Sequence, residues 1–544
     1  MHKTRGADVL AQALSRAGVN RIFTVSGNHV MPVFDATLDA GLELIHTRHE
    51  AAAVHMADAW GRLTGEAGIA LVTGGPGHAN ALSALFSAQL AESPMVLLSG
   101  HAPQDQLGRG AFQEMRQSDI ATLVTKASWT ASRAAALGSE IARAIHIARS
   151  GRRGPVHLSL PTDVLETEAG SRDAPDAASF LPSTMPLLVA DAQAIVARLA
   201  SASRPLILAG PMGRTRAGRG LARTLEDTAG IPVVGMESPR GIGDSSLGAF
   251  AAMLGQADCI LLLGKRTDFT LRFASSPTLA STCEFMQVDA ETIEFERTRR
   301  AVGNRLVATA VADSFSALGS LALAAATRRH AHAGWLQEVR SAIRYRPAAW
   351  DRATSGVPGR LHPVQVCRPL QALLDRHPDS VLVSDGGEFG QWAQACLTAP
   401  HRLINGPAGA IGAALPMALA ARLAQPDAPV LAMTGDGSFG FHIAELDTGV
   451  RYRLPVVAVV GNDARWNAEY QIQYHAYGPD RLVGCELLPT RYDRVTEAFG
   501  GYGEYVDQAE ALAPAALRAH ASGLPSCLNV ALDGMPAPVI KSSS

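Results

Sequence analysis

The chain has 544 residues, of which 47% are apolar and 18% charged, and its formal net charge is −2. That length exceeds a single hydrophobic core, so we expect two to four domains in a well-packed protein. The balanced charge gives no electrostatic reason to expect a nucleic acid or an anionic membrane as partner. A small-molecule partner is favoured.

The cysteines and the apolar runs of the sequence indicate the cellular compartment. Six cysteines are spread thinly, without a CxxC pair, which argues against a disulfide framework or a zinc site. No run of eighteen apolar residues exists, and residues 1–8 lack the apolar core of a secretory signal. We therefore expect a cytoplasmic protein without a membrane partner.

The first hundred residues alternate short apolar runs with stretches of helical spacing. We expect strands at 21–25, 42–47, 68–73 and 94–99. We expect helices at 29–40, 50–63 and 77–91. Buried strands that alternate with helices predict a parallel sheet with helices on both faces.

The same alternation returns near the carboxyl terminus. Here we expect strands at 380–384, 429–434 and 456–460, and helices at 412–424 and 442–452. Strand-like runs at 205–209 and 259–263 predict a third α/β unit between the two ends. The stretches 168–186 and 345–363, rich in proline and polar residues, are expected to be linkers. The prediction is three α/β domains at 1–168, 187–330 and 356–544.

The strongest local motif is the run TGDGSF at 434–439, directly after an apolar strand. Glycines that follow a strand let the backbone approach a phosphate closely. Asp436 between them offers a hard oxygen to Mg²⁺. A lone motif of this kind is as often a structural turn as a phosphate and metal site. The functional interpretation therefore depends on a second candidate metal ligand elsewhere in the sequence.

Asp463 is the partner, in the run GNDAR at 461–465, twenty-seven residues after Asp436 and again directly after a strand. Two neighbouring strands would then end in oxygen-bearing side chains at one edge of the sheet. Ligands of open α/β sheets bind at that edge. The structural alternative for Asp463 is a helix cap.

This spacing resembles the signature of enzymes that use thiamine diphosphate (ThDP), which begins with GDG and ends in an asparagine pair. The resemblance implies a divalent metal, expected to be Mg²⁺, held by Asp436, Asp463 and the main chain of Arg465. The chain departs from the usual motif because Asp463 stands where asparagine is normal. Aspartate is still a good hard ligand, but its charge beside a diphosphate is expected to weaken cofactor binding.

The run TRHEAAA at 47–53 resembles the RHE segment of acetolactate synthases and benzaldehyde lyase. By that resemblance Glu50 is the carboxylate that activates the aminopyrimidine ring of the cofactor. By itself, a glutamate in a first helical turn is most often a favourable partner of the helix dipole. The run GGPGHAN at 74–80 resembles the family's GPGxTN segment and supports the activating role.

Two further segments match the family in order. In GAIG at 409–412, Ile411 would prop the cofactor in its bent form, and the carbonyl of Gly409 would accept from its amino group. The run DGGEF at 385–389 matches the loop near the diphosphate, where the anionic Glu388 is unexpected. The cofactor-binding residues implied by the resemblance are Glu50, Pro76, Asn80, Gly387, Glu388, Phe389, Gly409, Ile411, Gly435, Asp436, Gly437, Ser438, Asp463, Arg465 and Trp466.

Two segments concern the branch of the family. SGNH at 26–29 resembles benzaldehyde lyase and the lyase-like proteins, and AFQE at 111–114 matches a segment with an active-site glutamine. The resemblance implies that His29 and Gln113 face the thiazolium ring and relay protons; capping or packing is the alternative for His29. Trp466, Tyr470 and Gln473 either line a substrate pocket or lie on a surface helix.

The resemblance covers nearly the whole chain. It implies a pyrimidine-binding domain first, a central Rossmann-like domain, and last a domain that binds the diphosphate and metal. In the family the cofactor lies between two subunits, so a homodimer or homotetramer is implied. GKRTDFTLR at 264–272 looks more like the lyase branch than the flavin-binding synthases, and whether FAD or ADP binds there is left open.

We therefore expect a ThDP- and Mg²⁺-dependent lyase or carboligase. Its substrates would be 2-hydroxy-carbonyl compounds or 2-oxo acids, with 2-hydroxyacyl-CoA and aldehydes included. Acetolactate synthase, which forms 2-acetolactate from pyruvate, is one alternative, and a non-catalytic protein of this fold is another. A nicotinamide or flavin Rossmann oxidoreductase is disfavoured because no GxGxxG turn follows the first strand.

Overall fold

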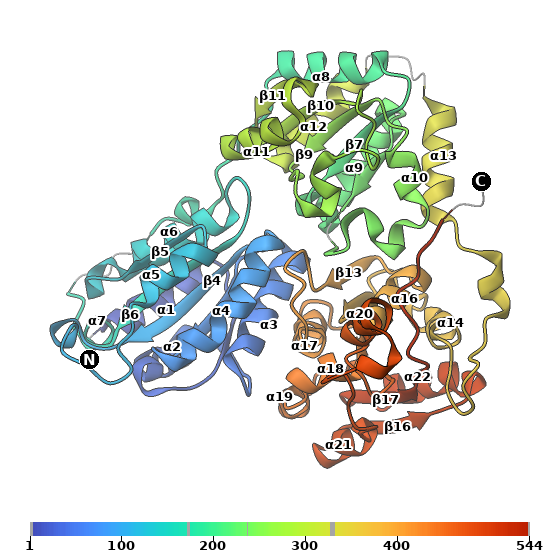
Figure 1. Cartoon of the computed structure of the whole chain (residues 1–544). Helices are drawn as coiled ribbons and strands as arrows, with labels where there is room; N and C mark the ends of the chain where they lie inside the picture. Colours follow the sequence, from blue (N-terminus) through green and yellow to red (C-terminus); the bar gives the residue numbers. More distant parts are fainter. Residues whose placement is uncertain (1–3, 171–174, 237, 327–331, 542–544) are drawn as a thin grey trace.

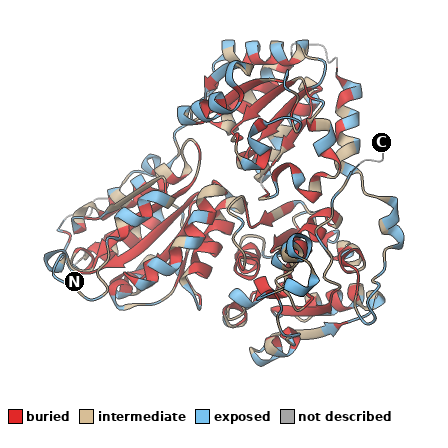
Figure 2. Cartoon of the chain, viewed as in Figure 1, coloured by how far each residue is buried: buried red, intermediate tan, exposed pale blue. Residues whose placement is uncertain are grey.

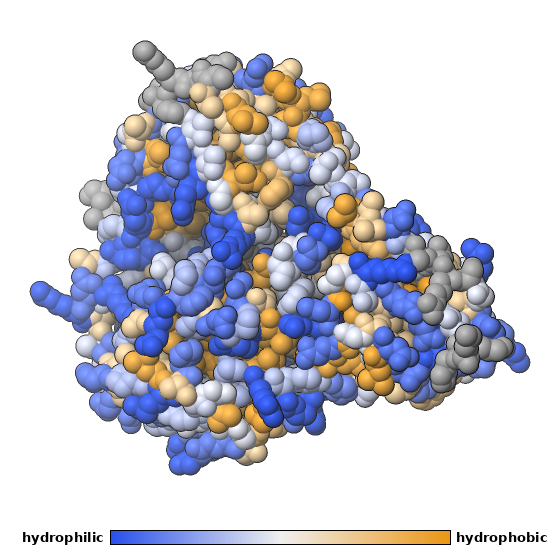
Figure 3. Space-filling view, turned by 180° about the vertical axis from the view of Figure 1, so that it is seen from behind, coloured by the Kyte–Doolittle hydropathy of each residue, from blue (hydrophilic) through white to orange (hydrophobic). Residues whose placement is uncertain are grey.

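The computed structural model describes residues 4–170, 175–236, 238–326 and 332–541. They form three α/β bodies arranged in a triangle, the first blue, the central one green and the last orange to red (Figure 1). Buried strands lie inside each body and partly exposed helices cover them (Figure 2). Seen from behind, hydrophilic and hydrophobic side chains are interspersed over the surface (Figure 3). Within the described ranges, no helix is long and apolar enough to cross a membrane.

The amino-terminal domain, domain 1, contains a six-stranded parallel sheet in the order β2-β1-β3-β4-β6-β5. Its strands are β1 (Arg21–Thr24), β2 (Glu43–His46), β3 (Gly68–Val72), β4 (Met95–His101), β5 (Ala127–Thr130) and β6 (Pro155–Pro161). Its helices are α1 (Gly6–Arg16), α2 (Met31–Ala40), α3 (Glu50–Thr64), α4 (Pro76–Leu90), α5 (Gln117–Ala121), α6 (Leu137–Arg149) and α7 (Thr162–Glu166). The central strands β3, β4 and β6 are buried along their whole length, as a sheet covered on both faces requires.

The central domain contains a five-stranded parallel sheet in the order β11-β10-β9-β7-β8. Its strands are β7 (Pro205–Ala209), β8 (Val233–Gly235), β9 (Cys259–Leu263), β10 (Glu284–Asp289) and β11 (Leu306–Val311). Its helices are α8 (Val189–Ser201), α9 (Arg216–Ala229), α10 (Phe250–Leu254), α11 (Thr292–Val302), α12 (Ser314–Ala325) and α13 (Ala333–Arg344). α13 packs on this sheet through Trp335, whose Nε1 donates to the carbonyl of Pro205 at 2.8 Å.

The carboxyl-terminal domain, domain 3, repeats the six-stranded plan in the order β13-β12-β14-β15-β17-β16, and all pairings are parallel. Its strands are β12 (Val381–Asp385), β13 (His401–Ile404), β14 (Val430–Gly435), β15 (Val457–Asn462), β16 (Tyr502–Val506) and β17 (Ser526–Ala531). Its helices are α14 (Pro363–Cys367), α15 (Gln371–Leu374), α16 (Glu388–Cys396), α17 (Ala414–Ala424), α18 (Asp436–Phe441), α19 (Glu445–Arg451), α20 (Asn467–Tyr477), α21 (Tyr492–Ala498) and α22 (Leu512–Ala521).

The domains are joined by apolar and by ionic contacts. α3 of domain 1 packs against α17 of domain 3, and side chains of both domains form one continuous buried cluster. Domain 1 meets the central domain through a buried group in which Arg152 contacts the carboxylates of Glu92 and Asp289. The three bodies are therefore packed together rather than merely tethered.

The predicted fold class, three parallel-sheet α/β domains, is confirmed. The strands predicted at 205–209 and 259–263 coincide with β7 and β9. The helix predicted from residue 29 begins at Met31, because Asn28–Val30 form a short 3₁₀ helix. The linker predicted at 168–186 contains a 3₁₀ helix at Ala177–Phe180 that buries Phe180 against the core of domain 1, and its residues 171–174 lie outside the described ranges.

Candidate active site

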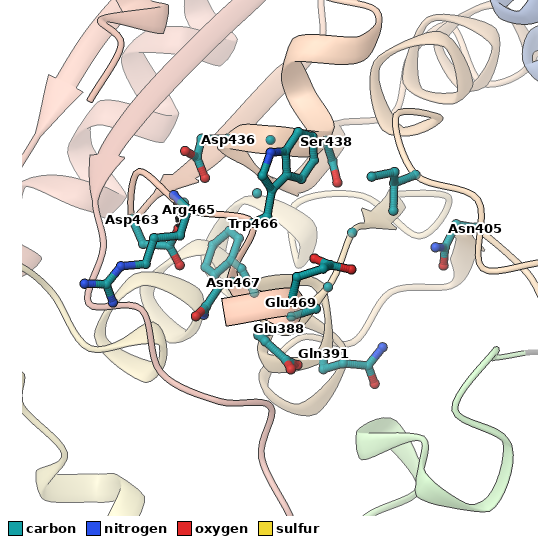
Figure 4. Close-up of a pocket in the computed structure, with 18 of the residues that line it drawn as sticks. Glu388, Gln391, Asn405, Asp436, Ser438, Asp463, Arg465, Trp466, Asn467 and Glu469 are labelled. Atoms are coloured by element: carbon teal, nitrogen blue, oxygen red, sulfur yellow. Dashed lines mark hydrogen bonds between the residues drawn. The ribbon is translucent and has the colours of Figure 1, made fainter. Parts of the chain in front are cut away.

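Three adjacent strand ends in domain 3 surround one cavity. β12, β14 and β15 are neighbours in the sheet, and the loops that follow them enclose a volume of about 210 Å³. Their side chains converge on this space (Figure 4). The residues that line it are Arg240, Gly386, Gly387, Glu388, Phe389, Gln391, Asn405, Gly409, Ile411, Gly435, Asp436, Gly437, Ser438, Gly461, Asp463, Arg465, Trp466, Asn467, Ala468 and Glu469. Every cofactor residue predicted in this domain is among them.

Glycines allow the backbone that lines the cavity to approach neighbouring side chains closely. A Cβ atom on Gly437 would lie 2.6 Å from the indole of Trp466, and a Cβ on Gly461 would lie 2.6 Å from the ring of Phe389. Gly386 adopts φ +79°, and a Cβ there would collide with the hydroxyl of Ser438. A side chain at any of these positions would displace a residue of the cavity wall, so the observed shape of the cavity depends on glycine here.

Two carboxylates meet at the ends of β14 and β15. Gly435 and Gly461 are register partners at the ends of these strands, and the side chains of Asp436 and Asp463 just beyond them are in hydrogen-bond contact. Both are buried, and Oδ2 of Asp436 has no hydrogen-bond partner among the described residues. Burial raises the pKa of Asp436 to about 6. Burial, followed by the negative charge of Asp436, raises the pKa of Asp463 well above its usual range. Repulsion between two buried carboxylates is the situation that a divalent cation relieves.

Arg465 contributes its main chain to this pair. Its amide N–H donates to Oδ1 of Asp463 at 3.1 Å. Its guanidinium lies over the ring of Tyr470 at 4.0 Å, so the positive charge faces an aromatic ring. No cluster of three or more His, Cys, Asp or Glu able to hold a metal occurs in the described parts of the chain. A cation at this pair would therefore complete its shell with carbonyl or ligand oxygens.

Glu388, unexpected beside a diphosphate, has a counterion. It is the first residue of α16, and its Oε2 lies 3.3 Å from Nη2 of Arg240 in the central domain. Burial raises the pKa of Glu388, and the charge of Arg240 opposes that rise. Nothing in the sequence near residue 240 indicates this contact, because it is made between two domains.

Three other lining residues were not predicted from the sequence, because they belong to no motif and are marked only by their position after a strand or in a first helical turn. Asn405 follows β13, and its Nδ2 donates to the carbonyl of Ala410 at 2.9 Å, which fixes the loop that carries Ile411. Asn467 and Glu469 lie in the first turn of α20. A search for polar residues just after each strand would have found Asn405. Tyr470 and Gln473 do not line the cavity, and α20 has no buried residue, as in the surface-helix alternative.

A second group of predicted residues gathers on domain 1. Glu50 begins α3, and its Oε2 accepts from Nδ2 of Asn80 at 3.0 Å. Pro76 opens α4, one residue before Gly77, at which a Cβ would lie 3.4 Å from Oε1 of Glu50. The two helix starts thus form one polar surface.

His29 and Gln113 border this surface. His29 is buried, and its Nδ1 lies 3.2 Å from the hydroxyl of Thr73, which precedes the turn into α4. Burial, and then the charge of His101, lowers the pKa of His29. Gln113 has φ +57° and packs against Gly75, where a Cβ would lie 2.7 Å from its carbonyl oxygen.

The two groups are separate within one chain. The lining of the cavity in domain 3 includes no residue of domain 1. The Glu50 group instead faces outward, with Asn80 and Pro76 exposed.

Comparison with known proteins gives the family. Three family models match in order: the N-terminal TPP binding domain of thiamine pyrophosphate enzymes at 4–120, the central domain at 192–314 and the C-terminal TPP binding domain at 385–530. The chain is 35% identical to the probable acetolactate synthase of Mycobacterium bovis, over 98% of this chain and 96% of the relative. It is 31% identical to the 2-hydroxyacyl-CoA lyase 2 of Homo sapiens, over 92% and 84% of the two chains. The chain belongs to the thiamine pyrophosphate (thiamine diphosphate) enzyme family.

Proposed function

We propose that the protein is a ThDP- and Mg²⁺-dependent lyase or carboligase that acts on 2-hydroxy-carbonyl compounds or 2-oxo acids. The observation that carries this proposal is the pair of half-sites. One is a glycine-lined cavity with two buried carboxylates, and the other is the Glu50 surface bordered by His29. Bound ThDP supplies carbanion chemistry at a carbonyl carbon.

The residues of the cavity fit a metal and a diphosphate. Asp436 and Asp463 would hold Mg²⁺ together with the main-chain carbonyl of Arg465, since hard oxygen ligands suit this ion. The unpartnered Oδ2 of Asp436 supports that assignment. Gly437 would leave room for the diphosphate, and Ile411 would support the bent cofactor.

The residues of domain 1 would handle protons. Glu50 would hold a proton at the aminopyrimidine nitrogen. Its hydrogen bond from Asn80 fixes the direction of its carboxylate. His29 would accept the proton that leaves a substrate hydroxyl when the neighbouring C–C bond breaks.

A homodimer, or a homotetramer built from it, would bring the two half-sites together. Exposed apolar side chains near both support an interface there. Phe112 of domain 1 is 69% exposed, and Phe441 and Ile472 of domain 3 are 56% and 64% exposed. The test is subunit complementation: we expect Glu50→Gln and Asp436→Asn chains to be inactive when each is expressed alone. Co-expressed chains should regain about a quarter of the wild-type activity by random pairing. No recovery would mean that each site is built from one chain.

The substrate class is tested with purified protein, ThDP and Mg²⁺ on pyruvate, 2-hydroxyacyl-CoAs, benzoin and aldehydes, with products read by mass spectrometry. Aldehyde released from a 2-hydroxyacyl-CoA or from benzoin supports the lyase. The Glu50→Gln chain should release none. Glu66→Gln, which changes the exposed partner of the ion pair with Arg149, is the matched control.

Acetolactate synthase is the second candidate, because a relative of that name matches 98% of this chain. Acetolactate formed from pyruvate, in preference to aldehyde release, would select it. ThDP binding without any product from the panel would favour a non-catalytic protein of this fold.

A further inference from the structure

The cavity in domain 3 is acidic, although the proposed cofactor brings a diphosphate into it. Its charged lining residues are four carboxylates and two guanidinium groups, from Glu388, Asp436, Asp463, Glu469, Arg240 and Arg465. Mg²⁺ would offset the charges of Asp436 and Asp463. The diphosphate would still meet the carboxylates of Glu388 and Glu469, so a positive side chain is required on that side of the cavity.

Of the two arginines in the lining, Arg465 is directed elsewhere. Its guanidinium lies over the ring of Tyr470 at 4.0 Å. In Figure 4 its side chain points away from Glu388 and Glu469. Arg240 lies next to Glu388 instead, with 3.3 Å between its Nη2 and Oε2 of the carboxylate. Arg240 is therefore the cation on the side of the cavity that the metal would leave acidic.

Arg240 has hydrogen-bond donors to spare. A guanidinium carries several N–H groups in a planar fork, and among the described residues that of Arg240 has one hydrogen-bond partner, Glu388. The side chain lines the cavity and is 44% exposed, so its other donors can reach a ligand there. A guanidinium can bind a carboxylate on one edge and phosphate oxygens on another.

The helix that carries Glu388 is docked on the same part of the central domain. Glu388 is the first residue of α16, on the side of domain 3 that faces the central domain (Figure 1). Further along this helix, Oγ of Ser245 donates to the carbonyl of Gln391 at 2.6 Å. Nε of Arg346, just after α13, donates to the carbonyl of Ala395 at 2.6 Å. The three contacts are spaced three and four residues apart, along one side of α16, so Arg240 is held at the start of this helix.

We propose that Arg240 is a cofactor-binding residue supplied by the central domain: Glu388 orients its guanidinium, and the free N–H groups donate to the diphosphate of ThDP. This inference rests on the proposed function. It gives the anionic Glu388 a role beside a diphosphate, as the group that holds the arginine in place. The central domain, which contributes no other residue to the lining of the cavity, thereby takes part in cofactor binding.

The first test measures the Kd of ThDP in the presence of Mg²⁺ from the change in tryptophan fluorescence, with Trp466 in the lining as reporter. Arg240→Gln should raise the Kd by about tenfold or more, because charge-assisted hydrogen bonds are lost. Arg240→Lys keeps the charge without the planar fork and should raise the Kd less. Arg198→Gln breaks an exposed ion pair with Glu284 in the same domain and, as the control, should leave the Kd unchanged.

The second test separates binding by Arg240 from two indirect effects. If Arg240 only offset the charge of Glu388, the double variant Arg240→Gln/Glu388→Gln would bind ThDP as tightly as Glu388→Gln alone. We expect it to bind about tenfold more weakly, since the amide oxygen in Glu388→Gln can still accept from Arg240. If Arg240 acted only by docking α16, Ser245→Ala would weaken binding as much as Arg240→Gln does, whereas we expect a smaller loss.

Inorganic pyrophosphate is the probe for the part of the cofactor that Arg240 contacts. With Mg²⁺ it should displace ThDP from the wild type, and its inhibition constant should rise in Arg240→Gln by the same factor as the Kd of ThDP. An inhibition constant that stays while the Kd rises, or a Kd that stays in Arg240→Gln, overturns the role of Arg240 and leaves the proposed function intact. A wild-type protein that does not bind ThDP overturns the proposed function, and this role with it.

Discussion

Removing a carboxylate from the proposed metal site should stabilise the metal-free protein. Asp436 is 1% exposed and stands beside Asp463. An asparagine at position 436 carries no charge, so it can be buried there without a cation. We therefore expect Asp436→Asn to unfold at a higher temperature than the wild type in EDTA, although the variant loses metal-dependent activity.

The size follows from the pKa of Asp436. Burial raises it from 3.8 to about 6, and two pH units correspond to about 3 kcal/mol. Because the folded-state pKa is the higher one, ionisation in the folded protein costs free energy. The cost is absent below pH 3.8, grows between 3.8 and 6, and is complete above 6. At pH 7.5 the variant should be more stable by about 3 kcal/mol, or about 6–12 °C for a domain of this size.

The assay is thermal unfolding in EDTA at pH 4.5 and pH 7.5, with exposed Asp427→Asn as the control. The advantage of Asp436→Asn should be several times larger at pH 7.5. Added Mg²⁺ should raise the melting temperature of the wild type at pH 7.5 and leave that of the variant unchanged. An advantage of equal size at both pH values, or a variant no more stable than the wild type at pH 7.5, would refute the reasoning.

Three further outcomes are expected. Gly437→Ala should weaken ThDP binding at least tenfold by fluorescence titration, with an unchanged circular dichroism spectrum, because its Cβ would lie 2.6 Å from Trp466. Arg152→Gln should lower the free energy of unfolding in urea by about 3–5 kcal/mol, since it leaves two buried carboxylates unpaired; a loss below 1 kcal/mol would contradict this. Asp463→Asn should weaken Mg²⁺ binding in the absence of ThDP at least tenfold by calorimetry, because one of two negative charges is lost; unchanged affinity would count against Asp463 as a ligand.

The sequence predicted those parts of the fold whose pattern is local. Strands such as β7 and β9 are uninterrupted apolar runs, and both were predicted with their observed bounds. β5 and β16 were missed because they lie at sheet edges and are partly exposed, so their composition resembles that of loops. β6 was missed for another reason: it is wholly buried but carries the polar residues His157 and Ser159, whose Nδ1 and hydroxyl are hydrogen-bonded to Ser128 and Gln117.

The candidate site also contains residues that local motifs predict and residues that only tertiary packing brings there. Residues such as Asp436 and Asp463 stand in motifs, and the sheet register that makes them neighbours follows from strand order. Arg240 stands in no motif and reaches Glu388 only because the central domain packs against domain 3. Contacts between domains depend on tertiary packing, which no periodicity encodes.

Within one chain, the packing of domains 1 and 3 keeps the two half-sites apart. Domains 1 and 3 are joined by the helix faces of α3 and α17, which bury apolar side chains in a shared core. That contact leaves the loops after β14 and β15 open, and the same holds for the start of α4 with Asn80. A polar surface of this kind is stable in water, whereas the reaction proposed needs water excluded from the cofactor. We infer that closure comes from a second chain, whose domain 1 would bring Glu50 and His29 over the cavity of the first.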